Sequence, residues 1–276
     1  MTTTPKTLTW IAGSARVQFR IDRESPAALL EWGDLTAAYS ALTEWSDHQP
    51  LVEITAVGHG LQHGGPTYEA SLIGRRLRYE SHSVSADGNV LRIVQGDAVL
   101  GLRVETVLRG YPGVSALRAY TIVENQGERP VRLQSVSSLA LGIALDPDSS
   151  RVVTGAASWT AEGRWTIEPL RTSSTVQYRP EIHGKGHPGG LQVASMGSWS
   201  TGRVLTTGGV LDDASHRALM WQIEHNGAWQ YQLTERPSGI AVILMGPTDL
   251  ESQWSPVLAP GESVETVPVA IAQAVG

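Results

Sequence analysis

Carboxylates that could work as an acid–base pair lie close together at two points of the chain, Asp146-Pro147-Asp148 and Asp212-Asp213. Two opposed carboxylates can transfer protons to and from a reacting bond, as hydrolases require. Both clusters, however, lie in turn-forming sequence between predicted strands, where Asp side chains accept hydrogen bonds from the backbone. We therefore expect both clusters to stabilise turns and not to catalyse a reaction.

Glu224 and His225 are adjacent and could be the base and acid of a mutarotase-like reaction. Such a reaction needs both side chains to converge on one substrate ring. The pattern places Glu224 on the polar face of a hairpin and His225 in its turn. The prediction is a solvated hairpin edge.

Two pairs of His residues have a spacing of four, His59 with His63 and His183 with His187. On a helix this spacing would point both rings toward one metal ion. The glycines around each pair indicate loops, and no third ligand is suitably spaced, so we predict no metal site and no cofactor. His183 and His187 remain candidate binding groups, because loops commonly carry such groups.

Composition excludes several classes of function. The net charge of −6, without a Lys/Arg cluster, argues against a nucleic-acid partner. Cysteine is absent, which excludes disulfides and thiolate chemistry. The N-terminal residues 1–6 lack an apolar signal region, and no apolar run is long enough to span a bilayer. A cytoplasmic protein without a membrane partner is the expectation.

Nine Trp and seven Tyr stand against one Phe. Indole and phenol rings combine a flat apolar face with a hydrogen-bonding edge, which suits the faces and hydroxyls of sugars. The alternative is that Trp fills a wide space between two sheets. Most of the Trp residues are expected to do so.

Residues 219–233 predict two strands around a turn. A three-residue loop, with Gly227 in the left-handed region, pairs Ile223 with Trp229 and Trp221 with Tyr231. The apolar residues then share one face, and the other face carries Gln222, Glu224, Gln230 and Gln232. A two-residue loop would put the two Trp residues on opposite faces. We predict the three-residue loop.

Alternation with period two, punctuated by turn signals, predicts a sandwich or barrel. The expected strands are 51–56, 90–95, 98–109, 116–124, 131–143, 239–245 and 264–272. Only Ser25–Tyr39 could hold a short helix. No repeat or linker divides the chain, so residues 1–276 are expected to form one β-domain.

Four segments resemble the N-terminal β-domain of α-galactosidases of glycoside hydrolase family 36. They span about residues 50 to 270 and comprise Pro50-Leu51-Val52-Glu53 leading into Gly74, Met196-Gly197-Ser198-Trp199-Ser200-Thr201, Trp221-Gln222-Ile223-Glu224-His225-Asn226-Gly227-Ala228-Trp229, and Leu258-Ala259-Pro260-Gly261-Glu262-Ser263 with Val267-Pro268-Val269-Ala270. The resemblance implies an all-β, mostly antiparallel, two-sheet β-supersandwich of the galactose-mutarotase type.

The resemblance also implies that the two catalytic carboxylates of the enzyme come from a (β/α)8 barrel that follows this domain. In the family the nucleophile lies in a Lys-Trp-Asp motif, and neither Lys of this chain is followed by Trp-Asp. A retaining glycosidase needs the two carboxyl groups about 5–5.5 Å apart. We therefore expect an accessory domain of a retaining α-galactosidase that is inactive alone. Its expected partners are its own C-terminal barrel, the galactoside at the rim of the active site and, in a homo-oligomer, further copies.

Trp199 is the first candidate for a side chain that reaches the sugar, with burial between the sheets as the alternative. Trp45, Asp47 and His48 are further candidates for the substrate rim. The segment around Asp47 lacks the Tyr- and Asp-rich sequence of large tetrameric relatives, which puts a substrate-binding role for Asp47 in doubt.

Two other functions compete with this interpretation. A free-standing carbohydrate-binding module would carry a row of exposed, coplanar aromatic residues. An aldose-epimerase-like enzyme would need a His and a Glu that converge on a concave sheet face, and Glu224-His225 at a hairpin tip is a poor match.

Overall fold

The computed structural model describes residues 6–13, 15–33, 48–61, 67–173, 190–236 and 239–276. Within these ranges the chain is built almost wholly of strands, and the paired strands are antiparallel. The strands are β1 Lys6–Ala12, β2 Ala15–Asp22, β3 Ser25–Trp32, β4 Ile54–Ala56, β5 Arg78–Val84, β6 Val90–Asp97, β7 Leu102–Gly110, β8 Ala116–Asn125, β9 Val131–Ile143, β10 Ser150–Ala156, β11 Arg164–Pro169, β12 Gly190–Ser195, β13 Thr207–Asp212, β14 Arg217–Ile223, β15 Trp229–Arg236, β16 Gly239–Met245, β17 Val257–Leu258, β18 Ser263–Glu265 and β19 Val269–Val275. The short helices are α1 Leu72–Arg76 and α3 Asp249–Ser252, with 3-10 turns η3 Tyr68–Ala70 and η4 Leu170–Thr172.

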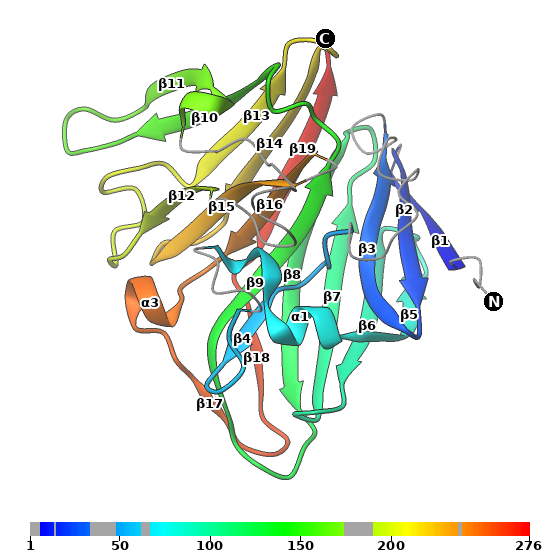
Figure 1. Cartoon of the computed structure of the whole chain (residues 1–276). Helices are drawn as coiled ribbons and strands as arrows, with labels where there is room; N and C mark the ends of the chain where they lie inside the picture. The colour runs from blue at the N-terminus through cyan, green and yellow to red at the C-terminus, as the bar shows by residue number, and fades with distance from the viewer. Residues whose placement is uncertain (1–5, 14, 34–47, 62–66, 174–189, 237–238) are drawn as a thin grey trace, which may run out of the picture.

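The described strands form three sheets (Figure 1). The large sheet has the order β11-β10-β13-β14-β19-β8-β7-β6-β5, and β18 also pairs with β8. The second sheet has the order β12-β15-β16-β9-β17, with β4 added on β9, and lies in front of the large sheet in Figure 1. Strands β1–β3 form a small sheet beside β5 and β6.

The core fills the space between the large and second sheets. Trp221 of β14 and Tyr231 of β15 meet across this space with ring centroids 5.2 Å apart, and Trp229 stacks on Tyr231 at 5.9 Å. Aromatic pairs at these separations add to the stability gained by burying their area. Gly208 on β13 pairs with Trp221, and a Cβ at Gly208 would lie 2.9 Å from both the indole and the Tyr231 ring. Glycine here therefore makes room for the aromatic cluster.

The predicted hairpin at residues 219–233 is wrong in its pairing. Strand β14 pairs on both edges, with β13 and β19, so β15 cannot add to it. The chain crosses instead to the second sheet, where β15 pairs with β12 and β16. Gly227 does not have a positive φ. The prediction that the apolar residues of both strands face one core is confirmed, because the two strands face each other across the sandwich.

Several strand boundaries are confirmed and others are wrong. Strands 131–143 and 239–245 match the prediction residue for residue. The strand expected from Ala98 begins at Leu102, because the preceding residues turn and Gly101 N donates to Asp97 O at 2.9 Å. The strand expected over 264–272 is split into β18 and β19.

The helix considered for Ser25–Tyr39 is wrong over its described part, because Ser25–Trp32 is strand β3. This strand is almost wholly buried, with apolar side chains on both faces, so its sequence lacks clear alternation. Continuous apolar runs of this length occur in buried strands and buried helices alike.

Candidate functional site

Trp199 lies on the surface, so its predicted alternative of burial between the sheets is wrong. Its side chain is 55% exposed, and the indole of Trp159 lies edge-on to it with ring centroids 6.3 Å apart. Trp159 is itself 76% exposed and belongs to the turn between β10 and β11. Three more exposed apolar side chains, Trp165, Ile167 and Met196, come from β11 and the segment after β12. We call these five residues the aromatic patch.

The backbone around Trp199 is anchored to the core. The buried Trp229 donates its Nε1–H to the Ser200 carbonyl at 2.8 Å. Gly202 N donates to the Trp199 carbonyl at 3.2 Å. Leu205 N donates to Gly155 O at 2.8 Å, which ties this segment to the β10–β11 hairpin. The motif around Trp199 therefore holds an exposed indole on a fixed support.

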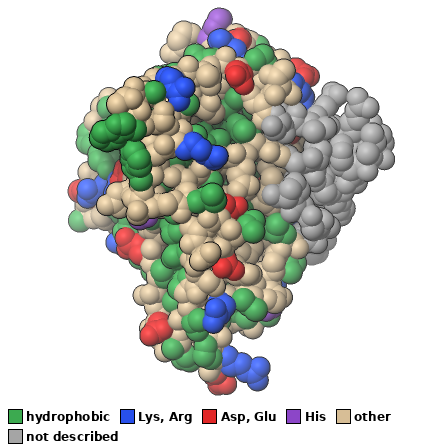
Figure 2. Space-filling view, turned by 90° about the vertical axis from the view of Figure 1, so that its left-hand side faces the viewer, with side chains coloured by type: hydrophobic (Ala, Val, Ile, Leu, Met, Phe, Trp, Pro, Cys, Tyr) green, Lys and Arg blue, Asp and Glu red, His purple; other side chains and the backbone are tan. Residues whose placement is uncertain are grey.

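Figure 2 views the molecule from the side that carries β11 and α3 in Figure 1. Hydrophobic side chains gather in the upper part of this face, with only scattered charged groups between them. The Trp159 and Trp199 rings are inclined at 70° to each other and so do not form one flat platform. The patch can therefore contact an apolar surface or the edge and face of a sugar ring.

His48 is buried and lies beside the guanidinium of Arg20. Arg20 Nη1 and His48 Nδ1 are 3.3 Å apart. A guanidinium can only donate, so Nδ1 accepts and the ring proton of the neutral imidazole is on Nε2. Burial lowers the pKa of Arg20, and Asp22 opposes this effect. His48 also lines a small pocket together with Arg75 and Arg78.

The remaining predicted site residues Trp45, Asp47, His183 and His187 lie outside the described residues. Trp199 and His48 share no ring contact, hydrogen bond or pocket in the described part of the chain. The structure therefore does not gather the described candidates into one site.

The family marker at Glu53 and Gly74 proves to be a buried carboxyl site. The Glu53 carboxyl accepts from Ser71 N at 3.0 Å and from the Ser71 hydroxyl, and it accepts from Gln49 Nε2 at 2.6 Å. A Cβ at Gly74 would lie 2.5 Å from Glu53 Oε2, so only glycine fits. Burial raises the pKa of Glu53 to about 8, against the lowering effect of the Ser71 hydrogen bonds. Glu69, which forms a buried ion pair with Arg236 at 2.7 Å, raises that pKa further.

The outer face of the second sheet carries Gln230 and Gln232, which the sequence analysis placed on the polar face of the predicted hairpin. Gln230 and Gln232 are fully buried there. Gln230 Nε2 donates to Thr248 Oγ1 and Glu251 Oε2, both at 3.1 Å, while Gln232 Oε1 accepts from Tyr68 N at 2.8 Å. These two side chains are buried because η3 and α3 pack onto this face, and the local sequence of β15 does not indicate that packing.

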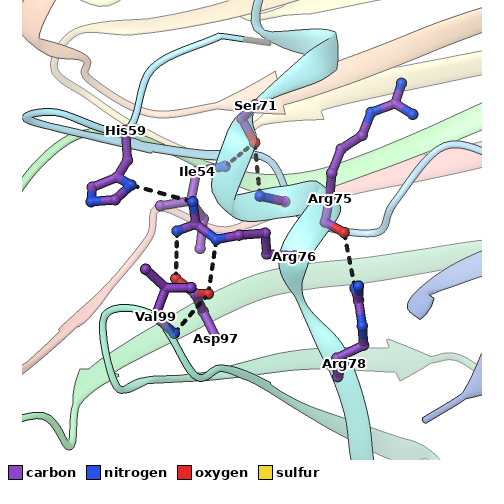
Figure 3. Close-up of polar contacts among 9 residues, drawn as sticks. Ile54, His59, Ser71, Arg75, Arg76, Arg78, Asp97 and Val99 are labelled. Carbon is purple, nitrogen blue, oxygen red and sulfur yellow. Dashed lines mark hydrogen bonds and ion pairs between the residues drawn. The ribbon is translucent and has the colours of Figure 1, made fainter. Parts of the chain in front are cut away.

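His59 and its neighbours form a separate cluster (Figure 3). Arg76 donates to both carboxylate oxygens of Asp97, from Nε to Oδ1 at 3.1 Å and from Nη2 to Oδ2 at 2.8 Å. Its Nη1 donates to His59 Nδ1 at 3.2 Å. The accepting Nδ1 requires a neutral ring. His63 lies outside the described residues. Within the described ranges, no group of three or more His, Asp or Glu residues is arranged to hold a metal ion.

The carboxylate clusters predicted to cap turns do so. Asp212 Oδ1 accepts from Ser149 Oγ at 2.5 Å and from Ala214 N at 3.2 Å. Asp146 Oδ1 accepts from Asp148 N at 2.9 Å. Glu224 pairs with Arg118 at 2.7 Å on the surface, so it is not directed toward His225 as an epimerase pair would be. Burial lowers the pKa of His225.

No helix in the described ranges has the length and apolar character of a membrane-spanning segment. No family model matches the sequence, and no curated protein is significantly similar to it.

The fold itself is an antiparallel β-supersandwich of the galactose-mutarotase type. A putative aldose 1-epimerase from Escherichia coli K12 matches 99% of this chain and 100% of its own, with 12% identity and a TM-score of 0.51.

Family 36 α-galactosidases share the fold more closely. AgaA from Geobacillus stearothermophilus matches 98% of this chain at 17% identity and a TM-score of 0.72. The galactosidase domain of the α-galactosidase–sucrose kinase AgaSK matches 98% of this chain at 12% identity and a TM-score of 0.73. In both comparisons the match covers 41% of the other chain, so this chain spans about two fifths of their length. The resemblance predicted from the sequence is confirmed in the fold.

Proposed function

We propose that this chain is the N-terminal accessory domain of a retaining α-galactosidase that hydrolyses terminal α-galactosides. The observation that carries the proposal is the match over 98% of this chain to only 41% of AgaA. The catalytic carboxylates would belong to a (β/α)8 barrel in the remainder of the enzyme. This domain would pack on the barrel, shape the rim of the active site and be inactive alone.

Two of the resembling segments support a structural role. Glu53 and Gly74 fix α1 to the strands around it. In the turn after β17, Glu262 Oε2 accepts from Ala259 N at 2.8 Å, and the buried Asn125 donates to Leu258 O at 2.8 Å. Side chains that make such hydrogen bonds stabilise the fold of the domain, and catalysis would then depend on other residues.

The aromatic patch supports a role at the rim. An exposed cluster of large apolar side chains on a soluble domain commonly marks a contact surface. In the proposed enzyme, Trp199 would contact the galactoside and the rest of the patch would contact the barrel. The isolated chain should then self-associate, because the surface that the barrel covers would be exposed.

Hydrolysis of an aryl α-galactoside tests the proposal. The 276-residue chain should show no turnover, and clear turnover that survives repurification would overturn the proposed division of roles. The gene sequence downstream is a second test, because a barrel with a Lys-Trp-Asp strand is expected there.

A free-standing carbohydrate-binding module is the second candidate, because the three Trp residues of the patch are exposed, although the 70° angle between the Trp159 and Trp199 rings departs from the coplanar row that such a module would carry. This module should bind galactosides saturably, with a change in Trp fluorescence that Trp199→Ala removes. The matched control is Trp10→Phe, because Trp10 is buried and distant in sequence from the patch. Binding without any barrel in the gene would favour this candidate over the first.

A further inference from the structure

Strand β11 closes one end of the large sheet, and none of the described strands pairs with its outer edge. Its only partner strand in the described part of the chain is β10, in an unbroken antiparallel register. All six residues of β11 are exposed, and the strand lies at the margin of the molecule in Figure 1. The strand at the other end of the sheet, β5, lies against β3 instead. An outer edge of this kind presents unpaired N–H and C=O groups to a further strand.

The hydrogen bonds of β10 show which way its backbone groups point. On the side of β13, Asp213 N donates to Ser149 O at 3.1 Å and Leu205 N donates to Gly155 O at 2.8 Å. Backbone groups point to alternate sides along an antiparallel strand. The odd-numbered residues of β10 therefore face β13, and its even-numbered residues face β11.

The register of β11 on β10 carries this alternation to the outer edge. The even-numbered residues of β10 lie opposite Arg164, Thr166 and Glu168, so the backbone groups of these three residues face inward. The N–H and C=O groups of Trp165 and Ile167 consequently point outward, where no described strand pairs with them. Two residues with outward donors and acceptors can exchange hydrogen bonds with an identical pair that runs antiparallel.

The sequence Arg164-Trp165-Thr166-Ile167-Glu168 is self-complementary about its central residue. If a two-fold axis relates two copies of β11, Thr166 lies opposite Thr166 of the second copy. Trp165 then lies opposite the second copy's Ile167, and Arg164 lies opposite its Glu168. Threonine pairs, aromatic–β-branched pairs and opposite-charge pairs all stabilise antiparallel sheets. Both the backbone groups and the charges therefore fit a second copy of the same strand.

The neighbouring registers are less favourable. An axis at Ile167 would place Trp165 opposite Pro169, which has no N–H to donate. An axis at Trp165 would place Glu168 opposite Glu162, so like charges would meet. The register described above avoids both conflicts.

We propose that β11 pairs with β11 of a second copy of this chain, antiparallel and centred on Thr166, so that two large sheets join into one. Six residues per chain are fewer than the roughly 20–30 on each side of a standard interface, so we expect a weak dimer. The inference goes beyond the proposed function, because the pairing needs neither a barrel nor a galactoside. It is also distinct from association through the side chains of the aromatic patch, because it runs through the backbone edge.

Cysteine cross-linking tests the register, because the chain contains no Cys of its own. Directly opposed residues of an antiparallel pair have Cα atoms about 4.5–5.5 Å apart, a distance that a disulfide spans. Thr166→Cys should therefore give a disulfide-linked dimer under mild oxidation. The covalent dimer accumulates even where the reversible dimer is weak.

Arg164→Cys and Glu168→Cys are the matched controls on the same face of the strand. In the proposed register each Cys lies about 13 Å from its own counterpart, because four residues at about 3.3 Å each separate them. Neither variant should cross-link alone, since a disulfide needs Cα atoms within about 7 Å. A mixture of the two variants should cross-link, because residue 164 of one copy lies opposite residue 168 of the other.

Charge reversal tests the complementarity without a disulfide. Arg164→Glu should weaken dimerisation about fivefold or more, because its opposite-charge pairs become like-charge pairs. Arg164→Glu/Glu168→Arg should restore the wild-type dissociation constant, because the pairs form again with their signs exchanged. Sedimentation equilibrium measures the three constants. The substituted side chains are exposed, so the variants should fold like the wild type.

Trp199→Ala separates this dimer from association through the aromatic patch. Trp199 is not part of β11, so the variant should dimerise like the wild type. Loss of the dimer in Trp199→Ala would assign association to the patch and overturn the proposal. A wild type that stays monomeric at about 1 mM, or equal cross-linking of Thr166→Cys and Arg164→Cys, would overturn it as well. None of these measurements depends on galactosidase activity, so a failure here leaves the proposed function standing and the reverse also holds.

Discussion

Replacing Glu53 by Gln should abolish a dependence of stability on pH that this one side chain creates. Glu53 is fully buried, and burial raises its pKa from the ordinary value of 4.5 to about 8. Its hydrogen-bond partners are Ser71 and Gln49, and Gln49 links it to the buried Glu69–Arg236 pair by accepting from Arg236 Nη1 at 2.7 Å. Gln fills nearly the same volume but cannot ionise.

The direction in which stability changes with pH follows from the pKa values of Glu53 in the unfolded and folded chains. Below pH 4.5 the carboxyl is neutral in the folded and unfolded chains, so it imposes no cost. Between pH 4.5 and about 8 only the unfolded chain ionises, and folding requires uptake of a proton. Stability should therefore fall across this interval and level off above pH 8. At 1.36 kcal/mol per pH unit, the total loss is about 5 kcal/mol, a large part of a typical domain stability.

The assay is urea unfolding of the wild type and Glu53→Gln at several pH values from 5 to 9. Other titrating groups are common to both proteins, so the difference between their pH profiles isolates Glu53. The Gln amide cannot accept every hydrogen bond of the carboxyl, and this places a constant offset between the two profiles. The wild type should lose about 3.5 kcal/mol more than the variant between pH 5 and 8, which is the part of the total loss that falls in this interval.

Parallel profiles would refute the reasoning. They would mean that the donors from Ser71 and Gln49 hold Glu53 ionised, so that hydrogen bonding outweighs the cost of burial. Ser71→Ala separates the two effects, because it removes the hydroxyl donor and should raise the pKa of Glu53 further.

Three further outcomes are expected. Gly208→Ala should lower the free energy of unfolding by about 1–3 kcal/mol, because its Cβ would lie 2.9 Å from two core rings. Gly60→Ala, with open space around it, should change the free energy of unfolding by less than about 0.5 kcal/mol. Urea denaturation measures both variants. Trp221→Ala should cost about 3–5 kcal/mol and the exposed Trp199→Ala close to nothing, and a similar loss from both would contradict the placement of Trp199. Asn125→Ala should cost about 2–4 kcal/mol by thermal unfolding, because two backbone carbonyls and one N–H lose their partner; an unchanged melting temperature would argue against this role.

The segments that resemble family 36 α-galactosidases predicted the fold correctly, but the sequence did not show the structural role of their side chains. Glu53 and Gly74 lie 21 positions apart in the printed sequence, and nothing local indicates that a Cβ on one would collide with the other. Trp199 was recognised as a candidate, yet its sequence fits a buried and an exposed indole equally well. Trp159, its neighbour in the patch, was missed because it comes from a different turn.

The sequence alone determined that most of this chain is built of strands and that the apolar residues of β14 and β15 face the core. Alternation with period two fixes the side of the strand on which each side chain lies, and so strands such as 131–143 could be predicted to the residue. Alternation does not determine the partner of a strand. Trp221 and Tyr231 are buried whether β14 and β15 pair in one sheet or face each other from two, and the hydrophobic effect favours both arrangements alike.

Only the tertiary structure decided between these arrangements, because both edges of β14 are already occupied by β13 and β19. The same is true of Gln230 and Gln232. Whether such polar side chains meet solvent or a buried partner depends on elements that are distant in sequence and pack over them. The pattern along the chain indicates the face of the strand on which a side chain lies, and the packing of distant elements determines which groups that side chain contacts.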